Sequence, residues 1–254
     1  MRLTKRCIEI FRFLVGAGWL TTSQVHRRFF PDATIDAARK RLRKLTEDGY
    51  LVMVQQHPMA EALFALGPAA KRFLERSGMP EITLWRKPPK HLEHFVGIND
   101  LRIAAELTSP LRYFFGCWEL PGTGWHYSII PDALFAIGER TFAAEFDRGL
   151  ETIRYFVRTK IGAYRHMLES FPLGAVLIVT DRRARMESLA KALIRENIPC
   201  IYTIIDLVKE HGLSSPVFFE HPDAHAKSLV RKSLVEVSSR EDSLIAPIYL
   251  NSVS

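Results

Sequence analysis

The feature that most constrains the fold is an uninterrupted apolar run in the second half of the chain. Residues 175–179 read AVLIV, within a strand-length segment that spans residues 174–180. A strand that is apolar at every position is buried on both faces, so it is expected in the centre of a sheet. The run is far shorter than the roughly twenty residues of a membrane span. The first residues also lack an apolar signal segment, which predicts a cytoplasmic protein without membrane contact.

The segments around this strand follow the order helix, three strands, helix, strand, helix, strand and short helix. This order predicts an α/β domain in which helices pack on a mixed sheet. The expected helices are residues 92–107, 151–169, 183–196 and 205–211, and the expected strands are residues 112–120, 127–137, 141–146, 174–180 and 199–204. The domain is placed at residues 90–211. Residues 212–254 form a tail that docks on it or on another subunit, with an amphipathic helix at 224–235.

Positive charge is concentrated in the first third of the chain. Residues 1–89 hold sixteen Lys and Arg against eight Asp and Glu, whereas residues 90–254 hold nineteen against twenty. A basic module joined to a nearly neutral one indicates that the first module meets a polyanion. The charge balance changes at the double-proline stretch 86–90, RKPPK, where proline prevents continuation of a helix. A domain boundary is therefore predicted near residue 87.

The first third is expected to be a winged helix-turn-helix over residues 1–86. Apolar spacing predicts helices at 4–17, 23–29 and 35–47, and strands at 50–56 and 61–66 that form a hairpin around the turn 57–60. Residues 67–75 are expected to form one further helix. The order of helix, short helix, basic helix and hairpin wing is that of a DNA-reading module.

Double-stranded DNA is the predicted partner of this module. A helix fits the major groove, and Lys and Arg around it neutralise phosphates. The predicted contacts are Thr34, Arg39, Lys40, Arg43 and Lys44 from the third helix, and Gln55 and Gln56 from the wing. The alternative is a winged helix that makes only protein contacts.

Three acids mark a possible reaction centre in the second domain. Asp132 follows Pro131 at an apolar strand, and Glu145 and Asp147 end the next strand. A hairpin between these strands would place Asp132 beside Glu145, where two carboxylates repel each other unless a cation lies between them. Carboxylate oxygens suit Mg²⁺ or Mn²⁺, so Asp132 and Glu145 are the predicted ligands. Such an ion would polarise a phosphodiester and activate water.

The pattern "Pro131-Asp132 … Glu145-x-Asp147" resembles the core of PD-(D/E)xK nucleases. That core has a lysine where this chain has Asp147. The resemblance implies that Lys160, on the next predicted helix, or Arg148 supplies the positive charge. An active metal-dependent endonuclease or nickase and a degenerate domain that does not cleave both stay open.

A second resemblance covers roughly residues 5–205. Three parts of the chain are similar to motifs of the bacterial replication-relaxation family: the stretch His94–Arg102, Pro131-Asp132 followed by the segment AEFDRGxE of residues 144–151, and Lys160-Ile-x-x-Tyr164. The resemblance implies a winged helix joined to a nuclease-like domain. It also implies a role in the control of plasmid or mobile-element replication or mobilisation, with replication or mobilisation proteins as partners.

The residues also allow plainer interpretations. Arg148 can pair with Asp147 or Glu151, and a carboxylate in the first turn of a helix offsets the helix dipole. A structural ion-pair network is therefore the alternative to a metal site. At the level of function, the alternatives are a transcriptional regulator whose second domain dimerises or senses a signal, and a protein–protein adaptor in a DNA-processing complex.

Overall fold

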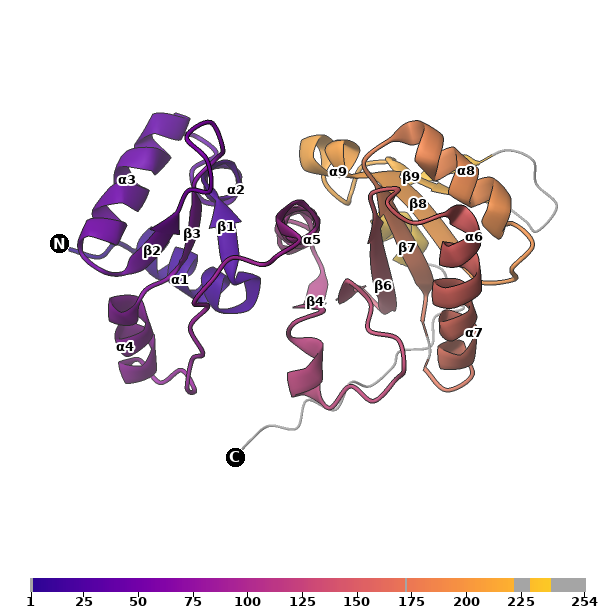
Figure 1. Ribbon diagram of the computed structural model, residues 1–254, viewed down its shortest axis with the longest axis horizontal. Coiled ribbons are helices and arrows are strands. Elements are labelled where there is room, and N and C mark those ends of the chain that lie inside the picture. Colours follow the sequence, from indigo (N-terminus) through magenta and orange to yellow (C-terminus); the bar gives the residue numbers. More distant parts are fainter. Residues whose placement is uncertain (1, 172, 222–228, 239–254) are drawn as a thin grey trace. The chain divides into compact units, whose positions relative to one another are not determined.

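The structure is a computed structural model that describes residues 2–171, 173–221 and 229–238. Its contacts divide the chain into two compact units, residues 1–99 and residues 100–254. The division falls inside helix α5 (Leu92–Glu106). Figure 1 shows the helices and strands of both units.

The first unit combines four helices with a three-stranded antiparallel sheet of order β1-β3-β2. Its helices are α1 (Lys5–Ala17), α2 (Thr22–Phe29), α3 (Ile35–Glu47) and α4 (Pro68–Arg76), and its strands are β1 (Trp19–Thr21), β2 (Leu51–Val54) and β3 (Leu63–Leu66). The predicted helices and the hairpin are therefore present at their predicted places. The short strand β1 was not predicted, and it forms the edge of the sheet opposite β2.

Side-chain caps fix the connections in this unit. The Thr21 hydroxyl accepts from the Gln24 amide N–H, and the Gln24 side chain accepts from the Thr21 N–H, each at 3.1 Å, so α2 begins in a capping box. Asn99, which is fully buried, donates from Nδ2 to the carbonyls of Ala17 and Trp19 at 2.9 Å. These two bonds satisfy carbonyls at and beyond the end of α1. They explain why the first unit extends beyond the predicted boundary near residue 87.

The second unit is built on a seven-stranded sheet of order β10-β9-β8-β7-β6-β5-β4. The strands are β4 (Leu111–Gly116), β5 (Ala133–Ile137), β6 (Arg140–Asp147), β7 (Ala175–Thr180), β8 (Cys200–Ile204), β9 (Phe218–Glu220) and β10 (Val230–Lys232). Strands β6, β7 and β8 are parallel, and the other neighbouring pairs are antiparallel. The apolar strand β7 is buried at every position and lies in the centre of the sheet, as predicted.

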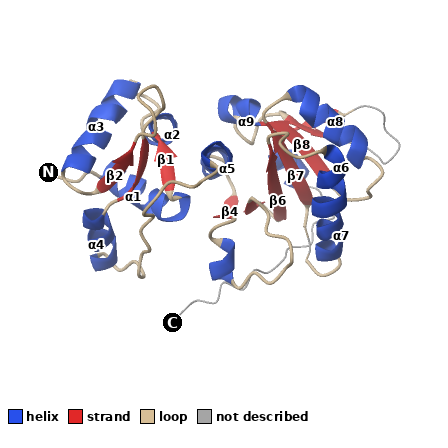
Figure 2. Cartoon of the chain, viewed as in Figure 1, coloured by secondary structure: helices blue, strands red, loops and turns tan. Residues whose placement is uncertain are grey.

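One face of this sheet packs against the helices that connect the parallel strands (Figure 2). These helices are α6 (Ile153–Tyr155), the π-helical η2 (Phe156–Ile161), α7 (Gly162–Leu168) and α8 (Arg183–Leu193). Tyr164 and Met186 share a buried cluster there with Val176 and Ile178 of β7.

The other face carries aromatic rings. Phe135 stacks on Phe114 and on Phe142, and the guanidinium of Arg102 from α5 lies 4.7 Å from the centre of the Phe114 ring. The C-terminal half of α5 therefore packs on this face. The remaining elements are a 3-10 turn η1 (Leu120–Thr123) and the helices α9 (Ile205–His211) and α10 (Leu234–Ser238).

Two expectations for the second unit were wrong in detail. The strand predicted at 127–137 begins only at Ala133, because Trp125 Nε1 donates to the Ile129 carbonyl within an irregular loop, and Pro131 has no N–H for a ladder. Part of the predicted tail adds strands β9 and β10 to the sheet. The helix predicted at 224–235 is contradicted by β10, while residues 222–228 lie outside the described residues.

The predicted fold class, a mixed α+β chain with helices on a mixed sheet, is confirmed. Within the described residues, no helix is long and apolar enough to cross a membrane.

Candidate functional site

The β5–β6 hairpin brings the first two predicted acids together. Ala133 pairs with Ala144, so Asp132 and Glu145 occupy the next position at the end of this antiparallel pair. Asp132 Oδ2 accepts a hydrogen bond of 2.7 Å from the backbone N–H of Phe146, which fixes its carboxylate against β6. The sequence prediction that these two carboxylates are neighbours agrees with this register.

Glu145 is held by the helix that follows β6. Its side chain is 2% exposed. Lys160 Nζ lies 2.5 Å from Glu145 Oε2, and the Tyr164 hydroxyl donates to Oε1 at 2.5 Å. Both oxygens of the carboxylate therefore have protein donors, and Lys160 lies beside Glu145, while the role predicted for Lys160 stays a prediction.

The ionisation of this cluster reflects burial and like charge. Burial, and then the charge of Asp132, raise the pKa of Glu145 to about 7, against the opposing effects of Lys160 and Tyr164. Burial would lower the pKa of Lys160, but the charges of Glu145 and Asp132 outweigh it and raise that pKa. Burial and the charge of Asp132 also raise the pKa of Cys117 to about 11. Lys160 is thus held as a cation, and Cys117 as a neutral thiol.

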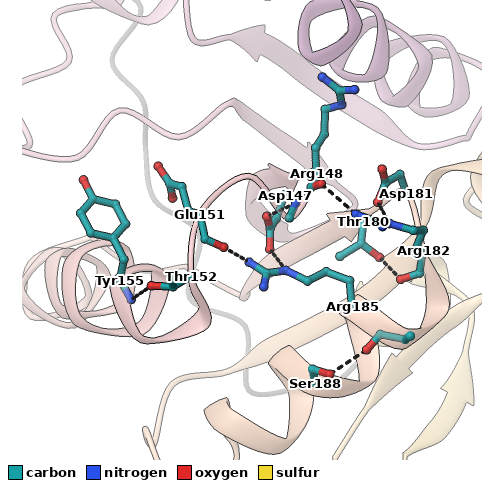
Figure 3. Close-up of polar contacts among 12 residues, drawn as sticks. Asp147, Arg148, Glu151, Thr152, Tyr155, Thr180, Asp181, Arg182, Arg185 and Ser188 are labelled. Atoms are coloured by element: carbon teal, nitrogen blue, oxygen red, sulfur yellow. Dashed lines mark hydrogen bonds and ion pairs between the residues drawn. The ribbon is translucent and has the colours of Figure 1, made fainter.

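Asp147 is directed into a different set of contacts, drawn in Figure 3. Its Oδ1 accepts from the Gly149 N–H at 2.7 Å, and its Oδ2 accepts from Arg185 Nε at 2.8 Å. Arg185 also donates from Nη2 to the Glu151 carbonyl at 2.8 Å. Asp147 therefore joins the loop after β6 to the start of α8. This contact is a structural ion pair, the alternative to a metal site, but the partner of Asp147 is Arg185 and not Arg148.

The backbone of Arg148 takes part in the same junction. Arg182 Nη2 donates to the Arg148 carbonyl at 3.4 Å, whereas the Arg148 side chain extends away from Asp147 in Figure 3. Gly149 follows with φ of +73°, and a Cβ there would lie 3.1 Å from Arg182 Nη2. This turn therefore favours glycine for its backbone angle and for the close approach of an arginine.

The described acids do not form a three-ligand site for a divalent cation as they are arranged. Mg²⁺ and Mn²⁺ prefer about six oxygen ligands. Both oxygens of Glu145 are bound by Lys160 and Tyr164, and both oxygens of Asp147 are bound elsewhere. Over the described part of the chain, no group of three His, Cys, Asp or Glu side chains is placed to hold a metal. The ammonium group of Lys160 supplies the positive charge that the two carboxylates need.

The predicted DNA contacts on α3 lie on its exposed side. Ala38, Leu42 and Leu45 are buried, and the four predicted basic residues are exposed. Arg39 pairs with Asp36 at 2.9 Å, Arg43 with Glu47 at 3.8 Å, and Lys44 with Asp48 at 3.5 Å. Among the described residues, Lys40 has no hydrogen-bond or ion-pair partner.

The other predicted contacts have local roles as well. Thr34 caps α3 by accepting from the Ala37 N–H at 3.4 Å. Gln55 donates to the carbonyls of Pro58 and Ala60 at 3.0 Å and so holds the turn of the hairpin, while Gln56 is exposed.

Sequence reasoning named Tyr164 only as part of a family motif, without a contact, and it missed Arg185. Tyr164 follows Lys160 by one helical turn, so helical spacing predicts that it shares the face of Lys160. Arg185 had no local signal, because it reaches Asp147 only through the parallel pairing of β6 with β7, which aligns Asp147 with Thr180.

The chain is similar to a known protein family. The model of the replication-relaxation family matches residues 11–172, which is more than half of the chain. The matched region runs from α1 through α7 and includes α3, the hairpin, Asp132, Glu145 and Lys160. A comparison with curated proteins gives no match.

Proposed function

The chain belongs to the replication-relaxation family, and from this premise we propose that it binds duplex DNA in the control of plasmid or mobile-element replication or mobilisation. Membership suggests a role in replication or mobilisation. The DNA-binding element that we assign is α3, in a first unit that acts as a winged helix-turn-helix.

The exposed basic face of α3 is the observation that carries this proposal. Four basic side chains lie on the exposed side of α3, and the apolar stripe of the helix is buried. A helix of this kind fits the major groove, where its N-terminal residues face base edges and its Lys and Arg reach phosphates. Thr34 lies at the N-terminus of α3, and Gln55 and Gln56 follow the first strand of the hairpin.

The ion pairs along α3 do not oppose DNA binding. Exposed pairs of this spacing contribute only about 0.3–0.5 kcal/mol each. A phosphate can therefore replace Glu47 or Asp36 as the partner of Arg43 or Arg39 at little cost in stability. Lys40 has no described pair to break.

For the second unit we propose a nuclease-like scaffold that does not cleave DNA. The contacts of Asp147 with Gly149 and Arg185 support this assignment, because among the described residues they leave Asp132 and Glu145 without a third acid placed to complete a metal site. A nuclease-like fold without cleavage can still bind partners, since function belongs to the site and not to the fold.

A plasmid assay tests both parts of the proposal. We expect the wild-type chain to shift a labelled duplex in EDTA as well as in Mg²⁺ and in Mn²⁺, because binding through α3 needs no divalent cation. We also expect it to leave supercoiled plasmid intact, as Asp132→Ala does. Metal-dependent nicking that is lost in Asp132→Ala would overturn the scaffold assignment and establish a nuclease. Failure to shift any duplex would overturn the DNA-binding assignment.

A further inference from the structure

The helix after β6 has an exposed surface that the proposed function does not use. Tyr155 is 51% exposed and Leu150, in the loop before it, is 82% exposed. Arg154 and Arg158 are exposed, lie one helical turn apart and flank Tyr155. In the described structure, neither arginine has a hydrogen-bond or ion-pair partner. We refer to Arg154, Tyr155 and Arg158 as the Tyr155 surface.

The start of α8 also carries arginines and is bonded to the loop before this surface. Arg182 and Arg183 are exposed, although they pair with Asp181 at 3.3 Å and with Glu187 at 3.0 Å. The bonds from Arg182 and Arg185 to the carbonyls of Arg148 and Glu151 fasten the loop before α6 to α8. The exposed acid nearest in sequence to the surface is Glu151, so the unpaired charge of the Tyr155 surface itself is positive.

An exposed aromatic ring between two unpaired arginines has a specific use. Guanidinium groups bind phosphate oxygens through charge-assisted hydrogen bonds. An aromatic ring stacks on a base only when the base is unpaired and accessible, so this combination is typical of surfaces that follow a single strand. In a duplex the faces of the bases are already stacked and would leave Tyr155 without a partner.

We propose that the Tyr155 surface binds single-stranded DNA, with Tyr155 stacked on a base and Arg154 and Arg158 on phosphates to either side. This inference rests on the proposed function in taking DNA as the nucleic acid. It adds a second, single-strand contact to the duplex contact of α3. Figure 3 shows the Tyr155 ring clear of the Asp147–Arg185 contacts, so its substitution leaves that junction intact.

Fluorescence anisotropy of the full chain with a labelled oligothymidylate of about 16 nucleotides tests this proposal. We expect Tyr155→Ala to weaken binding by about tenfold or more, because one stacked base contributes about 1–3 kcal/mol, whereas Tyr155→Phe retains wild-type affinity. The double variant Arg154→Ala, Arg158→Ala should lower the slope of log K against log salt by about 0.7 for each lost phosphate contact. Arg195→Ala, at an exposed and unpaired arginine beyond α8, is the matched control.

The same titrations separate this inference from the proposed function. Loss of duplex binding in Lys40→Ala, Arg43→Ala with oligothymidylate binding retained supports two distinct contacts. Two results would overturn the proposed single-strand contact and leave the duplex contact in place. One is an affinity for the oligothymidylate that is unchanged in Tyr155→Ala. The other is an affinity for the oligothymidylate that is lost in the α3 variant instead. Tighter binding of oligouridylate than of oligothymidylate would overturn the choice of DNA. Thermal unfolding at the wild-type temperature confirms that each variant is folded.

Discussion

Replacement of Lys160 by methionine is expected to lower the free energy of unfolding by about 3–5 kcal/mol at pH 8. The ammonium group of Lys160 lies 2.5 Å from a carboxylate oxygen of Glu145, whose side chain is 2% exposed. Asp132 adds a second negative charge nearby. Removal of one partner leaves the other charge buried without compensation, which costs more than the pair contributes. Urea unfolding followed by circular dichroism measures the loss.

The loss should depend on pH in a defined direction. The pKa of Glu145 is about 7 in the folded protein, which is above its value in the unfolded chain. Protonated Glu145 therefore favours the folded state. This contribution to the free energy of unfolding is complete below the unfolded pKa and is lost as pH rises through about 7. Lys160 stays protonated over this range because its pKa is raised. The difference between wild type and Lys160→Met should therefore be small near pH 5, where Glu145 is protonated, and should grow as Glu145 ionises.

Two further variants identify the cause of this loss. Glu145→Gln removes the buried negative charge, so Lys160→Met, Glu145→Gln should recover much of the stability lost in Lys160→Met alone. Lys191→Met, at an exposed lysine of α8, should change the stability by less than about 0.5 kcal/mol. A loss in Lys160→Met that is equal at pH 5 and pH 8, or that Glu145→Gln does not reduce, would contradict the ion-pair account.

Reversal of two charges on α3 is expected to weaken duplex binding by at least about 100-fold, or about 2.7 kcal/mol. In Lys40→Glu, Arg43→Glu, two phosphate contacts are lost and two repulsive charges face the DNA. The fold should survive, because both side chains are exposed and Arg43 makes only a surface ion pair at 3.8 Å. Fluorescence anisotropy with a labelled duplex at fixed salt measures the change.

A variant with the same change in charge provides the control. Arg72 and Arg76 are exposed on α4 and are not among the contacts predicted on α3 and the hairpin. Arg72→Glu, Arg76→Glu should weaken binding much less, because only the long-range field changes. Equal losses in the two double variants would mean that net charge, and not α3, determines binding.

Local patterns in the sequence predicted much of this architecture. The apolar run of β7 indicated a central strand, and the apolar stripe of α3 indicated which of its side chains are buried. Elements with weaker local signals were missed. Strands β1, β9 and β10 have three residues each, and such short segments have no recognisable periodicity. Their strand conformation depends on pairing with partners distant in the sequence.

The candidate site divides in the same way. The sequence could predict that Asp132 and Glu145 are neighbours, because a hairpin fixes which residues face each other. The partner of Asp147 could not be predicted, because Arg185 is brought to it by a parallel crossover. The use of Lys160 came from resemblance, whereas the structure supplies its contact with Glu145.

The most direct measurement of the central claim is a salt titration of duplex binding by the full wild-type chain in EDTA. DNA binding through α3 predicts that log K falls linearly with log salt, by about 0.9 for each phosphate neutralised, and that the slope becomes shallower in Lys40→Ala, Arg43→Ala. Binding that is absent or insensitive to salt would contradict the account and favour an adaptor that contacts proteins.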